Sequence, residues 1–117
     1  MPGVSLSWAP SYPLLRAAMD EADRIETGTV HAGPVYCSDH FYFVDADITA
    51  GLRRLGTLGV EMESAGLYAA AAAEGAEALT VLTVSDHLFD SSQDMSADER
   101  ETLYATSVRV AAAALLA

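Results

Sequence analysis

The 117-residue sequence contains no lysine, so its six cationic side chains are all arginines. Seventeen aspartates and glutamates outnumber them and give a formal net charge of -11. Such a chain lacks the cationic surface that releases counterions from DNA or RNA, or that holds an anionic membrane. Nucleic acids and membranes are therefore not expected as partners.

The sequence also has a single cysteine, Cys37, so no internal disulfide can form. The first residues are neither basic nor continuously apolar, as a secretory signal would be. The longest uncharged apolar stretches, residues 67–73 and 110–117, are well short of the about 20 residues that span a bilayer. We therefore expect a cytoplasmic protein without a membrane span.

Hydrophobic residues make up 51% of the chain, enough for a packed core. After an irregular lead-in over residues 1–10, the patterns predict alternating helices and strands within one partial domain, residues 1–117. The expected elements are a helix over 11–24 with Pro13 in its first turn, one or two strands within 28–43, a short helix over 45–55, and a strand over 58–63. They continue with a helix over 64–74 that Gly75 ends, a buried strand over 78–84, and a long helix that follows the Ser96–Glu99 capping box and runs to the C-terminus.

The segment Ala78–Val84 is continuously apolar and lies between two helical patterns. This is typical of a strand in a parallel sheet that is covered on both faces. The fold class predicted is therefore α/β, with three layers in which helices pack on a mixed, largely parallel sheet.

Acidic residues follow two of the predicted strands directly. Glu61 and Glu63 are expected to share one face at the end of the strand over 58–63, and Asp86 follows the strand over 78–84. Ligands of open α/β sheets are commonly held at the carboxyl ends of strands. The alternative is that these acids only cap the helices or loops that come next.

The sequences GVEMESAGLY (residues 59–68) and LTVSDH (residues 82–87) resemble the nucleoside phosphorylase superfamily, and are most similar to the hexameric bacterial type of purine nucleoside phosphorylase. The resemblance covers nearly the whole chain and implies about half of a nucleoside phosphorylase fold. It also implies phosphate-dependent cleavage of purine ribonucleosides to base and ribose 1-phosphate.

The resemblance further implies roles for individual residues. Asp86 would be the general acid that protonates N7 of the purine, and Arg100 would approach that acid. Glu63 would accept hydrogen bonds from the ribose hydroxyls. The remaining expected contacts to the nucleoside are Phe41, which would stack on the base, and Val60, Glu61, Met62 and Ser85.

The amino-terminal half of such enzymes, with its glycine-rich phosphate loop and phosphate-binding arginines, has no counterpart in residues 1–117. Phosphate is expected as a co-substrate only if the missing half is supplied. We expect a homo-oligomer or a partner chain, because a half-sheet leaves edges that proteins normally cover. A truncated product, a natural small subunit and an inactive relative all remain open, as do a nucleosidase and a non-catalytic nucleoside-binding or assembly module.

No cofactor is expected. His31, Cys37, Asp39 and His40 contain metal-ligating side chains, but they lack the Cys-x-x-Cys or paired-histidine spacing of zinc sites. We interpret them as strand and turn residues.

Overall fold

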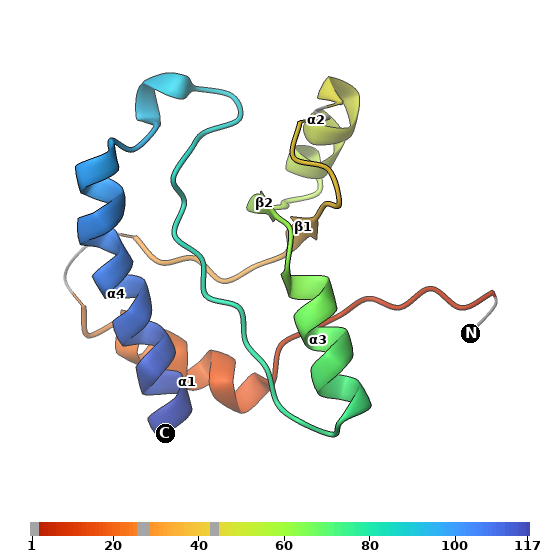
Figure 1. Cartoon of the computed structure of the whole chain (residues 1–117), viewed down its shortest axis with the longest axis vertical. Coiled ribbons are helices and arrows are strands. Elements are labelled where there is room, and N and C mark those ends of the chain that lie inside the picture. Colours follow the sequence, from red (N-terminus) through yellow and green to blue (C-terminus); the bar gives the residue numbers. More distant parts are fainter. Residues whose placement is uncertain (1–2, 26–28, 43–44) are drawn as a thin grey trace. The chain divides into compact units, whose positions relative to one another are not determined.

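The computed structural model describes residues 3–25, 29–42 and 45–117. In chain order they form α1 (Tyr12–Ala22), β1 (Val35–Cys37), α2 (Ala46–Arg54), β2 (Gly59–Glu61), α3 (Ser64–Ala73), a short 3-10 turn η1 (Ser91–Gln93) and α4 (Ala97–Leu116) (Figure 1). The predicted α/β class is confirmed. The ends of the predicted strand region, Gly28 and Phe43, lie outside the described residues.

The chain divides into two compact units, each described by itself. The sheet unit, Met1–Ser11 with Ala32–Leu79, contains β1, α2, β2 and α3. The helix-pair unit, Tyr12–His31 with Thr80–Ala117, contains α1, η1 and α4. No helix in the described parts of the chain is both long enough and apolar enough to cross a membrane.

In the sheet unit, β1 and β2 pair in parallel, with Tyr36 opposite Val60 and Cys37 opposite Glu61. The connection runs through α2, as a parallel pair requires a crossover. Asp45 begins α2 because its carboxylate accepts hydrogen bonds from the N–H groups of Asp47 and Ile48, at 2.9 and 3.1 Å. The predicted short helix is confirmed.

The helix α3 ends where the sequence predicts. Gly75 has a φ of +65°, which an L side chain rarely adopts. The N–H of Ala76 then reaches the carbonyl of Ala71 at 2.8 Å, the bond pattern of a Schellman cap. This left-handed residue closes the alanine-rich helix, and the chain continues toward Thr80 without a helix or strand.

The strand preceding α3 is shorter than the sequence pattern indicated. It ends at Glu61, so Met62 and Glu63 lie in a bend and not on the strand. The prediction that Glu61 and Glu63 share one face is therefore wrong, since Glu61 is buried and Glu63 is exposed. The cause is local, because the Glu61 carboxylate accepts hydrogen bonds from the backbone N–H groups of Glu63 and Ser64, where the chain turns into α3.

The prediction of a buried strand over Ala78–Val84 is wrong. No strand is assigned there, and Leu82 and Val84 are 46% and 61% exposed. A strand forms only where a neighbouring strand supplies backbone donors and acceptors. Within the described residues the sheet has two strands, β1 and β2, and neither pairs with this segment. The apolar pattern indicates a segment suited to burial, but it contains no information on whether a pairing strand is present.

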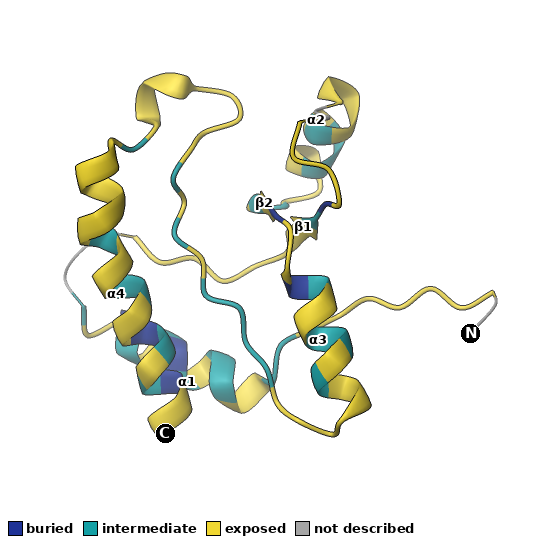
Figure 2. Ribbon diagram, in the orientation of Figure 1, coloured by how far each residue is buried: buried dark blue, intermediate teal, exposed yellow. Residues whose placement is uncertain are grey.

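In the helix-pair unit, α1 packs against α4, and the buried residues lie where the two helices meet (Figure 2). Ser11 and Pro13 start α1, as predicted from proline in a first helical turn. The contact buries four small apolar residues, Ala18 and Ala22 of α1 with Val110 and Ala114 of α4. An ion pair joins the same helices, with Arg109 Nε 2.7 Å from Glu21 Oε1.

Candidate functional site

The residues singled out from the sequence divide between the two units. Phe41 and the segment Val60–Glu63 belong to the sheet unit. Ser85, Asp86 and Arg100 belong to the helix-pair unit. Each group is therefore described within its own unit.

Glu61 is the acid of the sheet unit that is withdrawn from solvent, with 9% of its surface exposed. Its Oε2 atom accepts hydrogen bonds from the N–H groups of Glu63 at 2.8 Å and Ser64 at 2.6 Å. Its Oε1 atom accepts from the Ser64 hydroxyl. These bonds satisfy donors that the first turn of α3 would otherwise leave without partners.

The pKa of Glu61 is lowered from its ordinary value of 4.5. Burial acts in the opposite direction, since it disfavours the charged carboxylate. The Ser64 hydroxyl, the N–H groups of Glu63 and Ser64 and the Cys37 thiol together outweigh that effect, because all of them donate to the ionised form. Glu61 is thus ionised, and hydrogen bonds from the protein stabilise its charge.

Glu63 has a different environment, although it lies only two residues further along the chain. It occupies the N-cap position of α3 but makes no side-chain capping bond. Its Oε2 atom accepts one long hydrogen bond, 3.3 Å from the Met62 nitrogen. Glu63 is exposed, as are the neighbouring Met62 and Val60. Its carboxylate therefore keeps acceptor positions that could serve a ligand.

Phe41 presents its ring to solvent, with 72% of the residue exposed. Tyr42 contacts it edge to face, with ring centroids 5.0 Å apart and an interplanar angle of 81°. Because 72% of the residue is exposed, much of the Phe41 ring is open to solvent, and a flat aromatic ligand stacks on a ring face.

In the helix-pair unit, Asp86 is exposed and accepts a 2.5 Å hydrogen bond from the Ser85 hydroxyl. The loop around it is held by other groups. The Met95 N–H donates to the Ser85 carbonyl at 2.8 Å, and the His87 N–H donates to Asp94 Oδ1 at 2.6 Å. The loop is thus held by bonds to the Ser85 carbonyl and to Asp94, whereas Asp86 bonds to the Ser85 hydroxyl.

Asp94 and Asp90 are residues that the sequence interpretation missed. Asp90 accepts from the Ser92 N–H and hydroxyl and from the Gln93 amide. These bonds, with the Ser92 hydroxyl foremost, lower the pKa of Asp90. The sequence Asp-Ser-Ser-Gln-Asp over 90–94 was the available signal, because aspartate and serine bond to nearby backbone in turns.

Arg100 lies in the first turns of α4, where its N–H donates to the Ser96 carbonyl at 3.1 Å. The helix starts as predicted, with a capping box in which Glu99 N–H donates to the Ser96 hydroxyl and Ser96 N–H donates to Glu99 Oε2. The Ser96 backbone and hydroxyl donors lower the pKa of Glu99. The Arg100 side chain is exposed.

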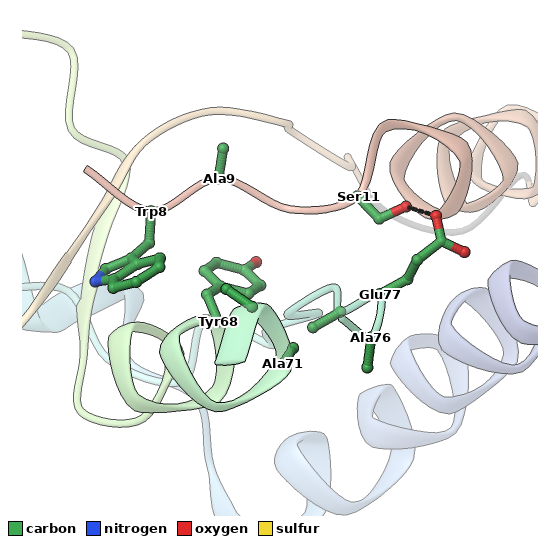
Figure 3. A pocket seen from close by; sticks show the side chains of 9 residues that line it. Trp8, Ala9, Ser11, Tyr68, Ala71, Ala76 and Glu77 are labelled. Carbon is green, nitrogen blue, oxygen red and sulfur yellow. Dashed lines mark hydrogen bonds between the residues drawn. The ribbon is translucent and has the colours of Figure 1, made fainter. Parts of the chain in front are cut away.

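A pocket of about 140 Å³ lies elsewhere in the sheet unit. Figure 3 shows the Trp8 and Tyr68 rings beside each other over α3, with the 2.6 Å bond from Ser11 Oγ to Glu77 Oε1 beyond them. None of the residues predicted for the site lines it. In the described part of the chain, no three histidine, cysteine, aspartate or glutamate side chains gather in a way that could hold a metal.

Comparison with known proteins gives a consistent result. A family model described as "Phosphorylase superfamily" matches residues 2–117. The DeoD-type purine nucleoside phosphorylase of Myxococcus xanthus (strain DK1622) is 44% identical over 100 residues, 86% of this chain and 41% of that protein. The DeoD-type 2 enzyme of Vibrio parahaemolyticus (serotype O3:K6, strain RIMD 2210633) is 42% identical over 100 residues, 86% and 42% of the two chains.

A similar protein from Clostridium perfringens (strain SM101 / Type A), also described as a DeoD-type purine nucleoside phosphorylase, is 40% identical over 109 residues, 91% of this chain and 45% of that protein. The chain thus spans less than half the length of these curated relatives.

Proposed function

Since the chain belongs to the phosphorylase superfamily, we propose that it acts on purine ribonucleosides as the nucleoside-binding and proton-donating portion of a purine nucleoside phosphorylase. The reaction is the exchange of ribose between a purine base and phosphate. The relatives whose names carry this activity support the proposal, at 44% and 42% identity over 86% of the chain.

The observation that carries the proposal is that some acids of the two units hold the local backbone, whereas others are exposed and do not. Glu61 holds the start of α3, and Asp94 holds the loop after Ser85. Glu63 and Asp86, the two acids that the resemblance assigns to ribose and base, are exposed and do neither task. Glu63 accepts a 3.3 Å bond from the Met62 nitrogen, and Asp86 accepts one from the Ser85 hydroxyl. An ionised carboxylate has further acceptor positions that can serve a ligand, which favours a site over simple capping.

The chemistry proposed is a substitution at C1′ of the ribose. A phosphate oxygen bonds to C1′ as the bond from C1′ to N9 breaks, and the bonding electrons leave with the purine. Asp86, as the acid, gives its proton to N7, so the base departs neutral, a step worth about 100- to 10,000-fold. Arg100 would stabilise the carboxylate that remains, since a nearby opposite charge favours the ionised form.

Binding of the nucleoside falls to the other residues named from the sequence. Glu63 would accept from the two ribose hydroxyls, and Phe41 would stack on the base. Met62 and Val60 would line the sugar and base, with Glu61 and Ser85 beside them. Of these, Glu61 differs in that its carboxylate already has donors from Glu63 and Ser64.

Phosphate would come from outside this chain. The chain covers 41–45% of its relatives, and its six arginines form no cluster in the sequence apart from Arg53 and Arg54. We propose that the complementary portion of the enzyme, on a partner chain or a further segment, supplies the phosphate site, and that the assembly is cytoplasmic.

Exposed apolar residues, which include Tyr36 of β1 and both Leu82 and Val84, support association of this chain. We propose a homo-oligomer or a complex with a partner chain, with an interface of about 1,000 Å² or more. Analytical ultracentrifugation at micromolar concentration should show a species heavier than 12.3 kDa. A monodisperse monomer would contradict the assembly proposal.

The function is tested by calorimetric titration of inosine and adenosine, followed by product analysis with and without phosphate. Phosphate-dependent release of ribose 1-phosphate would support the phosphorylase, and free ribose would support a nucleosidase of the same superfamily. Nucleoside binding without turnover would support a binding or assembly module. If neither nucleoside bound, the proposed function would be refuted.

A further inference from the structure

Glu61 is a buried carboxylate that none of the proposed chemical steps uses. It is the last residue of β2, and its hydrogen-bond donors come from three different elements. The Cys37 thiol donates from β1, the Glu63 N–H from the bend, and the Ser64 N–H and hydroxyl from α3. One side chain thus ties the strand pair, the bend and the helix together.

These bonds limit what else Glu61 can contact. An ionised carboxylate offers about four acceptor positions. The three bonds from Glu63 and Ser64 occupy both oxygens, and the Cys37 thiol adds a fourth donor. A nucleoside that bonded to Glu61 would have to displace one of these donors and leave it without a partner, which is unfavourable for a buried group.

The same bonds determine the backbone of Glu63. The side chain of Glu63 makes no capping bond to the helix. Its backbone N–H donates to Glu61 Oε2 at 2.8 Å, and this bond holds the Glu63 backbone. Glu63 has φ -122° and ψ -27°, and it precedes the first residue of α3 directly. The direction of its exposed carboxylate therefore depends on the bend that Glu61 holds.

We propose that Glu61 is a positioning residue: together with Ser64 it fixes the bend so that the Glu63 carboxylate is presented to the ribose hydroxyls, and it does not touch the nucleoside itself. This inference rests on the proposed function and refines it. It replaces the substrate contact expected for Glu61 with an action through Glu63.

The test compares ligands that do and do not contain ribose. The full chain and its Glu61→Gln, Ser64→Ala and doubly substituted variants are titrated with inosine and with the free base hypoxanthine. We expect inosine affinity to fall about 10-fold in Glu61→Gln and about 3-fold in Ser64→Ala, the loss of one or more bonds to a charged group. Hypoxanthine affinity should stay within about 2-fold of wild type, because Glu63 contacts only the sugar.

The double variant adds a check on the mechanism, since residues in one hydrogen-bond network are not additive. Its loss should be smaller than the product of the two single losses. The matched controls act on another serine–glutamate bond of the sheet unit, at 2.6 Å: Ser11→Ala removes its donor, and Glu77→Gln makes its acceptor neutral. They should leave both affinities unchanged.

A second readout needs no ligand. Hydrogen exchange of the Glu63 and Ser64 amides should be faster in Glu61→Gln than in wild type. If Glu61→Gln folds poorly, the affinities of Ser64→Ala still test the proposal, because that variant keeps both amide bonds to Glu61. Equal losses of inosine and hypoxanthine affinity, or unchanged exchange, would overturn the positioning role while the proposed function stood. If wild-type chain bound no inosine, the proposed function would fail, and this inference with it.

Discussion

The two units bury opposite kinds of residue. Among the described residues of the helix-pair unit, the buried ones are Ala18, Ala22, Val110 and Ala114, all apolar. In the described part of the sheet unit they are Ser38, Glu61 and Ser64, all polar. One unit is held by close packing of small side chains, and the other by hydrogen bonds that converge on one carboxylate.

This difference indicates which apolar surfaces the chain covers with its own residues and which it leaves exposed. Packing of α1 on α4 needs only residues that the chain contains. The sheet unit instead leaves Val35, Tyr36 and Val60 of its two strands between 36% and 43% exposed, surface that parallel strands normally cover. The polar network around Glu61 orders the bend before α3 without that cover.

The largest effect expected is on chemistry, and it separates the units by role. Asp86→Asn in the helix-pair unit should lower turnover of natural purine nucleosides by about 100-fold or more, while nucleoside affinity is largely kept. A 7-methylated purine nucleoside already carries the positive charge, so the variant should cleave it almost as well as wild type. Steady-state kinetics of the active assembly on both substrates measures this.

The control is Asp94→Ala, which removes the acceptor for the His87 N–H and so disturbs the same loop. It should slow both substrates alike. If Asp86→Asn also slowed both alike, damaged geometry would explain the loss, and if it slowed neither, Asp86 would have no part in proton transfer.

The second effect is on stability of the helix pair. Val110→Ala should destabilise the packing of α1 on α4 by about 2 kcal/mol, because Val110 is 4% exposed and its removal leaves a cavity. Val108→Ala, on the same helix but 47% exposed, is the matched control and should change stability little. Urea denaturation followed by circular dichroism compares them, and equal losses would contradict the packing described.

Sequence reasoning succeeded where the signal was local. The Ser96–Glu99 capping box, the glycine after α3 and the proline at the start of α1 each act within a few residues, and all three occur as predicted. It failed for Ala78–Val84, since a strand needs a pairing partner that no local pattern can report.

The candidate site shows the same limit. The Glu-Met-Glu and Ser-Asp motifs could be found from the sequence, and their roles stay predictions. The burial of Glu61 and the exposure of Glu63 could not be found, because both are acids of one type two residues apart. Only the hydrogen bonds to Ser64 and to the bend distinguish them.

The third effect concerns the exposed cap of α4. Ser96→Ala removes the acceptor for the Glu99 N–H and should destabilise the helix-pair unit by about 1 kcal/mol. Ser5→Ala, an exposed residue of the lead-in outside any helix or strand, is the control and should have no effect. Thermal unfolding followed at 222 nm measures both, and an unchanged midpoint for Ser96→Ala would show that the capping box contributes nothing to stability.

The smallest effect expected is on acid titration, and it compares a buried carboxylate with an exposed one. The folded-state pKa of Glu61 lies below 4.5, so its stabilising contribution is fully present above pH 4.5 and is lost as the pH falls through the lowered folded value. Ser64→Ala removes one donor to the ionised form and should raise the pKa of Glu61 toward 4.5. Because the two backbone donors remain, the change is partial.

Ser96→Ala should likewise raise the pKa of Glu99 and leave Glu61 unaffected. Carbon-13 titration of the two carboxyl groups in both variants tests this. A Glu61 titration that moved in Ser96→Ala, or failed to move in Ser64→Ala, would show that the hydrogen bonds at the start of α3 do not set its charge.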